Sequence, residues 1–260
     1  MSTRVSIIVT SYNRPKMLGW TIESALRQTY KNTEVIIVDA GSDAQAKHIG
    51  ESLASRKFFQ EGPHARVEFY EGEPGSLHNV SYIQLPNTGI ADARNMGVNA
   101  VATRYLSGGP DTVQKICTGD AIVFLDDDNW IEPTYIEKTV ALMTEGVGIV
   151  TTDMHVFSST GDSIVKAYHA VLNVLKDGNA IHSSSLISRE AFNQSGGNKK
   201  DVYEDWELWL NILSLGWNLR VVNEPLFHYR HVESSLITRH AERHEERINN
   251  MKALHPEIYG

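Results

Sequence analysis

The chain has 260 residues, of which 41% are hydrophobic and 22% charged, and it carries one cysteine. This length can enclose a hydrophobic core, and the composition argues against a disordered or fibrous chain. The 24 basic and 32 acidic residues give a formal charge of −8, which disfavours a nucleic-acid partner. A single cysteine excludes an internal disulfide and a cysteine-based zinc site. No apolar run approaches the roughly 20 residues that cross a bilayer, and no signal peptide is evident, so we expect a cytoplasmic protein that reaches membranes only through partners.

Short β-branched runs alternate with helical patterns through the first half of the chain. Strands are expected at residues 5–9, 35–38, 67–70, 122–125 and 147–152. Helices are expected at residues 17–28, 44–58, 90–102 and 133–143. Such alternation predicts an α/β fold with a mostly parallel central sheet flanked by helices.

The second half of the chain is less regular. Residues 157–179 show weak periodicity and are expected to be extended or mobile. A helix is expected at 202–216, short strands at 219–222 and 226–229, and a polar helix at 238–252.

Polar residues follow three of the predicted strands. These turns are Thr10 to Asn13, Asp39 to Asp43, and Asp126 to Asn129. Because ligands of parallel sheets bind beyond the carboxyl ends of the strands, we expect the three turns to meet at one edge of the sheet.

The run Asp126, Asp127 and Asp128 is the most specific feature of the sequence. Adjacent carboxylates repel one another unless a cation or solvent neutralises them. Mg²⁺ and Mn²⁺ take oxygen ligands, often one or two carboxylates together with substrate phosphates. The run therefore predicts a divalent metal site, and the alternative is a solvated acidic turn ahead of the helix at Pro133.

Two further residues near this edge have a structural and a functional interpretation. Asp39 is either a turn-former, because the sequence around it favours a turn, or a carboxylate that accepts hydrogen bonds from a base or ribose. Arg94 is the one arginine in a segment of small residues, Asn87 to Gly97, that opens a helix. It either binds phosphate or base, or forms a structural ion pair.

Acidic and histidine residues in the second half are the remaining candidates. Glu204 and Asp205 precede two tryptophans, so they either favour a helix start or supply a general base beside a surface that stacks on sugar. His228 and His231 are candidate metal ligands, although most histidines of a chain are surface or core residues.

Together, five segments resemble the family 2 glycosyltransferases, which have the GT-A fold. The segments are VSIIVTSYNRP from Val5, EVIIVDAGSD from Glu34, NTGIADARNMG from Asn87, IVFLDDDNWIEP from Ile122 and YEDWELWL from Tyr203. Each motif is weak by itself, but their order matches the family, and the resemblance covers residues 4 to 230.

The resemblance implies a role for each candidate. The expected nucleotide-sugar contacts are Thr10, Tyr12, Asp39, Arg94, Asp126 and Asp127, with Tyr12 against the base. The expected metal ligands are Asp128 and His228, with His231 as the fallback. The expected catalytic base is Asp205, with Glu204 beside it.

The resemblance also implies an inverting transfer of sugar from a nucleotide diphosphate sugar, most often a UDP-sugar, to an acceptor hydroxyl with Mn²⁺ or Mg²⁺. It implies one GT-A domain over residues 1–260, with a nucleotide-sugar half at 1–130, an acceptor half at 131–235 and a last helix at 236–260.

Ala40 stands where the family usually has a second acid, and no element of the processive synthases is found. The alternatives are a sugar-1-phosphate nucleotidyltransferase and an inactive sugar-nucleotide-binding module.

Overall fold

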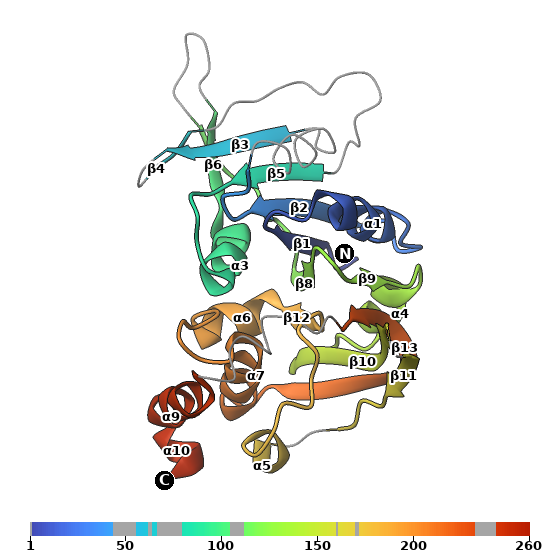
Figure 1. The fold of residues 1–260 in the computed structure, drawn as a ribbon, viewed down its shortest axis with the longest axis vertical. Helices are drawn as coiled ribbons and strands as arrows, with labels where there is room; N and C mark the ends of the chain where they lie inside the picture. Colours follow the sequence, from blue (N-terminus) through green and yellow to red (C-terminus); the bar gives the residue numbers. More distant parts are fainter. Residues whose placement is uncertain are drawn as a thin grey trace. The chain divides into compact units, whose positions relative to one another are not determined.

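The computed structural model describes residues 2–43, 56–61, 64–66, 80–104, 112–159, 161–169, 172–231 and 243–260. The chain divides into two compact units, Met1–Asp128 and Asn129–Gly260. Figure 1 gives the path of the chain through each unit.

The first unit is built on a sheet whose strands run in the order β4-β3-β5-β2-β1-β8. Its strands are β1 (Val5–Ser11), β2 (Thr33–Asp39), β3 (Arg56–Glu61), β4 (His64–Arg66), β5 (Val80–Gln84) and β8 (Ala121–Asp126). All neighbours pair in parallel except β3 with β4. The predicted α/β fold with a mostly parallel sheet is confirmed.

The central strands are buried along almost their whole length and are mostly apolar, because helices and neighbouring strands enclose them. Ile7, Ile8 and Val9 of β1 and Ile36 and Ile37 of β2 are fully buried. The helices among the described residues of this unit are α1 (Pro15–Leu26) and α3 (Ile90–Asn99).

Gly97 lets α3 approach the sheet closely. A Cβ at this position would lie 2.7 Å from the Cγ2 atom of Ile8 and 3.0 Å from that of Val38. A glycine therefore allows the last turns of α3 to pack against β1 and β2 without a clash.

The second unit is built around two long parallel strands. These are β10 (Val147–Ser158) and β13 (Asn218–Arg230). Antiparallel to them run β9 (Trp130–Ile131), β11 (Gly161–Val165) and β12 (Leu186–Ser188). The helices in the described part of this unit are α4 (Tyr135–Ala141), α5 (Leu172–Leu175), α6 (Arg189–Ser195), α7 (Glu204–Ser214), α9 (His244–Leu254) and α10 (Pro256–Tyr259).

Three elements of the first unit differ from the prediction. The helix predicted at 90–102 ends at Asn99, because the following Val101–Arg104 is β6 and pairs with β7 (Thr112–Lys115). Residues 56–58, predicted to close a helix, belong to β3, and β5 was not predicted. The strand predicted at 67–70 and the rest of the helix predicted at 44–58 lie outside the described residues.

The prediction of an extended or mobile stretch at residues 157–179 is correct only in part. The end of β10 and the whole of β11 are extended, but α5 is a helix that was not predicted. The strands predicted at 219–222 and 226–229 are one strand, β13, whose pairing with β10 shifts register near Pro225. Proline has no N–H to donate, and the polar residues around it hide the continuity of the strand.

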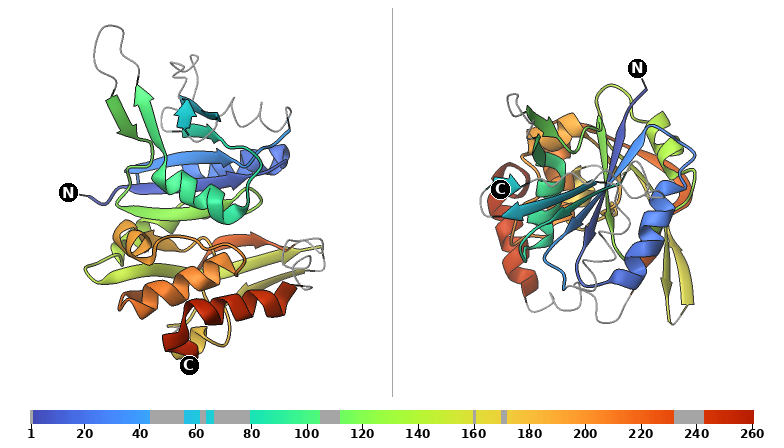
Figure 2. Two further views of the ribbon diagram at one scale, coloured as in Figure 1. Left: turned by 90° about the vertical axis from the view of Figure 1, so that its left-hand side faces the viewer. Right: turned by 90° about the horizontal axis from the view of Figure 1, so that it is seen from above.

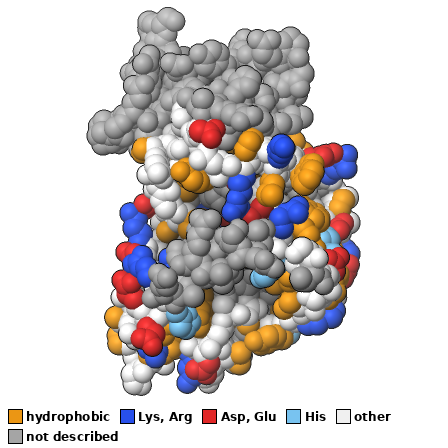
Figure 3. Space-filling model, in the orientation of Figure 1, with side chains coloured by type: hydrophobic (Ala, Val, Ile, Leu, Met, Phe, Trp, Pro, Cys, Tyr) orange, Lys and Arg blue, Asp and Glu red, His pale blue; other side chains and the backbone are white. Residues whose placement is uncertain are grey.

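None of the described helices has the length and hydropathy needed to cross a bilayer. Among the described residues on the face drawn in Figure 3, acidic and basic side chains are intermixed. Figure 2 adds two further views of the helices and strands.

Candidate active site

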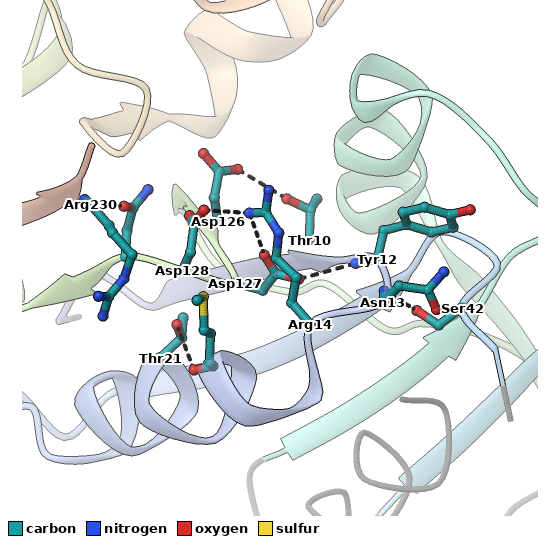
Figure 4. Close-up of polar contacts among 12 residues, drawn as sticks. Thr10, Tyr12, Asn13, Arg14, Thr21, Ser42, Asp126, Asp127, Asp128 and Arg230 are labelled. Atoms are coloured by element: carbon teal, nitrogen blue, oxygen red, sulfur yellow. Dashed lines mark hydrogen bonds and ion pairs between the residues drawn. The ribbon is translucent and has the colours of Figure 1, made fainter. Parts of the chain in front are cut away.

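The carboxyl ends of β1, β2 and β8 bring the predicted polar residues side by side. The strand register places Ser11 opposite Asp39, and Thr10 opposite Asp126. Figure 4 shows Thr10, Tyr12 and the three aspartates around this edge. The expectation that the three turns meet at one edge of the sheet is therefore confirmed.

The turns after β1 and β2 are also tied to each other. The Asn13 amide donates to the Ser42 hydroxyl at 3.0 Å, and the Asp43 amide donates to Asn13 Oδ1 at 2.7 Å. Asn13 adopts a φ of 54°, which asparagine tolerates better than most residues. The two loops therefore form one surface rather than two independent turns.

Asp39 is held by the protein through both carboxylate oxygens. Its Oδ1 accepts from the Ser42 amide at 2.7 Å, and its Oδ2 accepts from the Tyr82 hydroxyl at 2.5 Å. The residue is only 2% exposed. Asp39 thus acts as the turn-former that the sequence allowed, and each oxygen keeps a second lone pair for a ligand.

Asp126 and Arg94 form an ion pair. Asp126 Oδ1 accepts from Arg94 Nη2 at 3.1 Å and from the Thr10 hydroxyl at 3.2 Å. The Arg94 side chain is 2% exposed, and its guanidinium carbon lies 5.5 Å from the centre of the Phe124 ring. A buried cation needs such a partner, and the ion pair with Asp126 supplies it.

Asp127 turns toward the backbone of the first loop. Its Oδ2 accepts from the Tyr12 amide at 3.1 Å, and Arg14 Nη1 lies 3.3 Å from its Oδ1. Burial raises the pKa of Asp127 to about 7, although Arg14 and the Tyr12 amide favour the charged form. Desolvation outweighs these contacts because it penalises the ionised carboxyl directly.

Asp128 forms a close ion pair with Arg14. Burial opposes the charge of Arg14, but the neighbouring Asp128 and Asp127 together raise its pKa. Arg14 was not singled out from the sequence, although it lies in the VSIIVTSYNRP motif. The pairing depends on the register of β1 against β8, which the motif does not contain.

Tyr12 presents a side chain to solvent at this edge. The residue is 48% exposed, while its amide is used by Asp127. An exposed aromatic ring whose backbone is fixed is suited to stacking against a planar ligand.

The carboxylates of the first unit suit a metal that takes most of its ligands from elsewhere. No group of three metal-binding side chains occurs among the described residues. The side chains of Asp126 and Asp128 are 25% and 15% exposed, so one or two carboxylates reach the surface. That donor set fits Mg²⁺ or Mn²⁺, which commonly complete their shells with water and phosphate oxygens.

In the second unit, Asp205 lies in the first turn of α7. Its Oδ2 accepts from Asn179 Nδ2 at 3.0 Å, and its Oδ1 accepts from the Trp206 amide at 2.8 Å. Glu204 begins the same helix, where acidic side chains favour the helix dipole. Asn179 carries no sequence signal because it is distant from the motif and follows no strand.

His228 lies in a cluster of the second unit. Its Nε2 is 2.6 Å from Glu132 Oε1, its Nδ1 is 2.9 Å from His155 Nδ1, and its ring stacks on Trp130 at 5.0 Å. Both ring nitrogens are therefore engaged, and a metal would have to displace one partner. His231, the fallback, is exposed, and its amide donates to the Phe157 carbonyl at 3.0 Å.

Comparison with known proteins places the chain in a family. The profile of the family described as "Glycosyltransferase like family 2" matches residues 3–253. The Escherichia coli UDP-Glc:alpha-D-GlcNAc-diphosphoundecaprenol beta-1,3-glucosyltransferase WfaP is 28% identical over 230 residues, which are 87% of this chain and 76% of WfaP.

Two solved structures share the fold. Staphylococcus aureus TarS 1–349 in complex with UDP-GlcNAc aligns with a TM-score of 0.64 and 16% identity, over 90% of this chain and 60% of that one. The Pyrobaculum calidifontis mannosyltransferase PcManGT, in complex with GDP-Man and Mn²⁺, aligns with a TM-score of 0.61 and 18% identity, over 98% and 65%.

The chain spans 15% and 63% of the length of two further curated relatives that it matches. The family match nevertheless extends over nearly the whole chain, and the fold agrees with it. The chain therefore belongs to glycosyltransferase family 2 and carries a glycosyltransferase domain of the GT-A fold.

Proposed function

We propose that this domain transfers a sugar from a UDP-sugar to a hydroxyl of a carbohydrate or glycoconjugate acceptor, with inversion at the anomeric carbon. The observation that carries the proposal is the meeting of Tyr12, Asp39 and Asp126 at the carboxyl ends of adjacent parallel strands. Uridine is preferred because WfaP is named for UDP-Glc and TarS was solved with UDP-GlcNAc, whereas PcManGT was solved with GDP-Man.

The nucleotide would bind along the edge formed by the turns after β1 and β2. Tyr12 would stack on the base, and the remaining lone pairs of Asp39 would accept from it. Asp127, with a pKa raised by burial, would support the Tyr12 loop rather than face the sugar. Thr10 and Arg94 would act through Asp126, whose Oδ1 they both contact.

Asp128 and Asp126 would hold the divalent cation, whose chemistry when bound is to neutralise charge on the departing diphosphate. PcManGT, which was solved with Mn²⁺, supports the use of a divalent cation. Arg14 is the cation that Asp128 contacts in this structure. We leave His228 out of the proposed site because Glu132 and His155 occupy its ring nitrogens.

Asp205 would act as the general base. It would accept the proton of the acceptor hydroxyl while that oxygen attacks the anomeric carbon and the nucleoside diphosphate leaves. A positioned base of this kind contributes about 10²- to 10⁴-fold to the rate. That Asp205 joins the edge formed by β1, β2 and β8 stays a prediction.

The test is release of nucleotide from UDP-glucose, UDP-GlcNAc and GDP-mannose with MnCl₂, using water as a surrogate acceptor. Slow UDP release that Asp205→Asn lowers about 10²- to 10⁴-fold, to a residual rate that is still measurable, without loss of nucleotide binding, supports the proposal. Pyrophosphate formation from UTP and a sugar 1-phosphate would instead identify a nucleotidyltransferase. Tight binding of UDP-sugar with neither reaction would identify an inactive binding module.

A further inference from the structure

Side chains of α9, and of Arg243 directly before it, contact the three residues that lead into α7. In Figures 1 and 2 the two helices lie close together. The contacts are Arg243 Nη2 to Asp201 Oδ1 at 3.1 Å, Asn250 Nδ2 to the Asp201 carbonyl at 2.9 Å, Arg247 Nη1 to the Val202 carbonyl at 3.0 Å, and His244 Nδ1 to the Tyr203 hydroxyl at 2.8 Å. The backbone entering the base-bearing helix is therefore fixed from outside.

Arg247 is the central contact of this set. Its guanidinium donates to the Val202 carbonyl and also lies over the Tyr203 ring, at 5.4 Å from the ring centre. Val202 is 2% exposed, so the arginine holds a carbonyl next to the core rather than a surface loop. Hydrogen bonds from a charged donor are stronger than those between neutral groups.

A second contact lies two residues beyond Asp205. Glu207 Oε1 is 3.0 Å from His255 Nε2, and the two side chains are 1% and 5% exposed. His255 lies between α9 and α10. The hydrogen bond to Glu207 raises the pKa of His255, which favours the charged imidazole.

A third contact reaches the partner of Asp205. The Tyr259 hydroxyl of α10 donates to the Lys176 carbonyl at 2.9 Å, in the segment that leads to Asn179. Asn179 Nδ2 donates to the Asp205 carboxylate, and the Asn179 side-chain oxygen accepts from the Ile181 amide at 3.2 Å. Residues 243–259 thus contact the segment that precedes Asp205, the helix that carries Asp205, and the segment that leads to its partner Asn179.

From these contacts we infer that α9 and α10, here called the helical clamp, position Asp205 for proton transfer, with Arg247 as the principal positioning residue. The inference rests on the proposed role of Asp205 as the base. A displacement of about 1 Å in a reacting group can cost about 10²-fold in rate. Because the other contacts remain when Arg247 is replaced, we expect a smaller loss, of about 10-fold in kcat.

The experiment compares Arg247→Met, which removes the donor, with Arg247→Lys, which keeps a cationic donor. Arg220→Met is the matched control, because Arg220 bonds the Leu219 carbonyl of its own strand. The rate is UDP release from UDP-GlcNAc or UDP-glucose with MnCl₂, well below the melting temperature of each variant. Donor KM is measured alongside kcat, and Arg247→Met is repeated in the Asp205→Asn background.

The clamp is supported if Arg247→Met lowers kcat about 10-fold at unchanged donor KM, Arg247→Lys restores most of it, and Arg220→Met has no effect. In the Asp205→Asn background, Arg247→Met should cause no further loss, because the clamp acts through the base. An Arg247→Met variant with the parental kcat overturns the inference, as does an equal loss in the Asp205→Asn background. A fully active Asp205→Asn protein would refute the base itself, which is a distinguishable result.

Amide hydrogen exchange gives a readout that does not depend on turnover. Loss of the Arg247 contact should speed exchange in the first turn of α7, where Asp205 lies, while β10 keeps its protection. Uniformly faster exchange across the second unit would show general destabilisation and would count against a positioning role.

Discussion

Protonation of His182 should destabilise the protein in mild acid. His182 Nε2 accepts from the Thr152 amide at 3.3 Å, its Nδ1 is closed off from solvent, and its ring stacks on Phe227 at 4.5 Å. Burial lowers the pKa of His182 to about 3, from an ordinary value of 6.5. The folded protein therefore keeps this ring neutral where the unfolded chain binds a proton.

The sign of the effect follows from this difference. Because the unfolded state binds more protons below pH 6.5, the contribution of His182 to stability is present above that pH and is lost as the pH falls toward 3. At pH 5.0 the difference spans 1.5 pH units, which corresponds to about 2 kcal/mol at 1.36 kcal/mol per unit. Since part of the residue reaches solvent, we expect a loss of about 1 to 2 kcal/mol.

The assay is urea unfolding at pH 7.0 and 5.0 for the parent and for His182→Gln, whose amide oxygen can accept from Thr152 but does not titrate. The exposed His169→Gln serves as the control. The parent and the control should lose about 1 to 2 kcal/mol more than His182→Gln between the two pH values. Parallel losses in all three proteins would refute the assignment of a neutral, buried His182.

Three further predictions have signs that follow from the structure. The hydrogen bond to the buried Glu207 raises the pKa of His255, so the contribution of His255 to stability is present below pH 6.5 and is lost as the pH rises through its folded pKa. In His255→Gln, the midpoint of urea unfolding should therefore depend less on pH between pH 6 and 9 than in the parent. Gly97→Ala should destabilise the protein by about 1–3 kcal/mol, because the new Cβ would clash with side chains of the sheet. Gly19→Ala should instead stabilise it by about 0.5–1 kcal/mol, because no atom lies within 4 Å of the new Cβ. Thermal unfolding of both variants measures the difference. Tyr82→Phe removes a hydrogen bond to the buried Asp39 carboxylate and should lower the free energy of unfolding by about 1.5–3 kcal/mol. Tyr30→Phe removes a hydrogen bond to a backbone carbonyl and should lower it by only about 0.5–1.5 kcal/mol. Equal losses in the two variants would argue against a charged acceptor for Tyr82.

Much of the first unit could be predicted because its signals are local. The strands around Ile8, Ile36 and Phe124 are near-continuous apolar runs, which is the pattern of parallel strands covered on both faces. The expected meeting of their polar ends follows from the geometry of parallel sheets. β5 was missed although its VSYIQ run is rich in strand-forming residues, so its Tyr82 was not seen as a partner of Asp39.

The second unit resisted prediction because its strands contain polar residues. The Asn-Glu-Pro interruption in β13 broke one strand into two apparent ones, and the exposed β11 carries no alternation toward a core. The roles of Arg94 and His228 were likewise open, because a residue's motif does not reveal which acid or imidazole will face it.

The sequence by itself determined the fold class, the family, the positions of the acidic turns and the choice of Asp39, Asp126 and Asp205 as candidates. These depend on periodicity and motif order, which are properties of neighbouring residues along the chain. Only the tertiary structure decided that Arg14 faces Asp128, that Asp127 is buried against the Tyr12 amide, and that α9 holds the start of α7. Such pairings depend on strand register and helix packing, which bring together residues up to 115 positions apart. The local sequence around each residue therefore does not predict its partner.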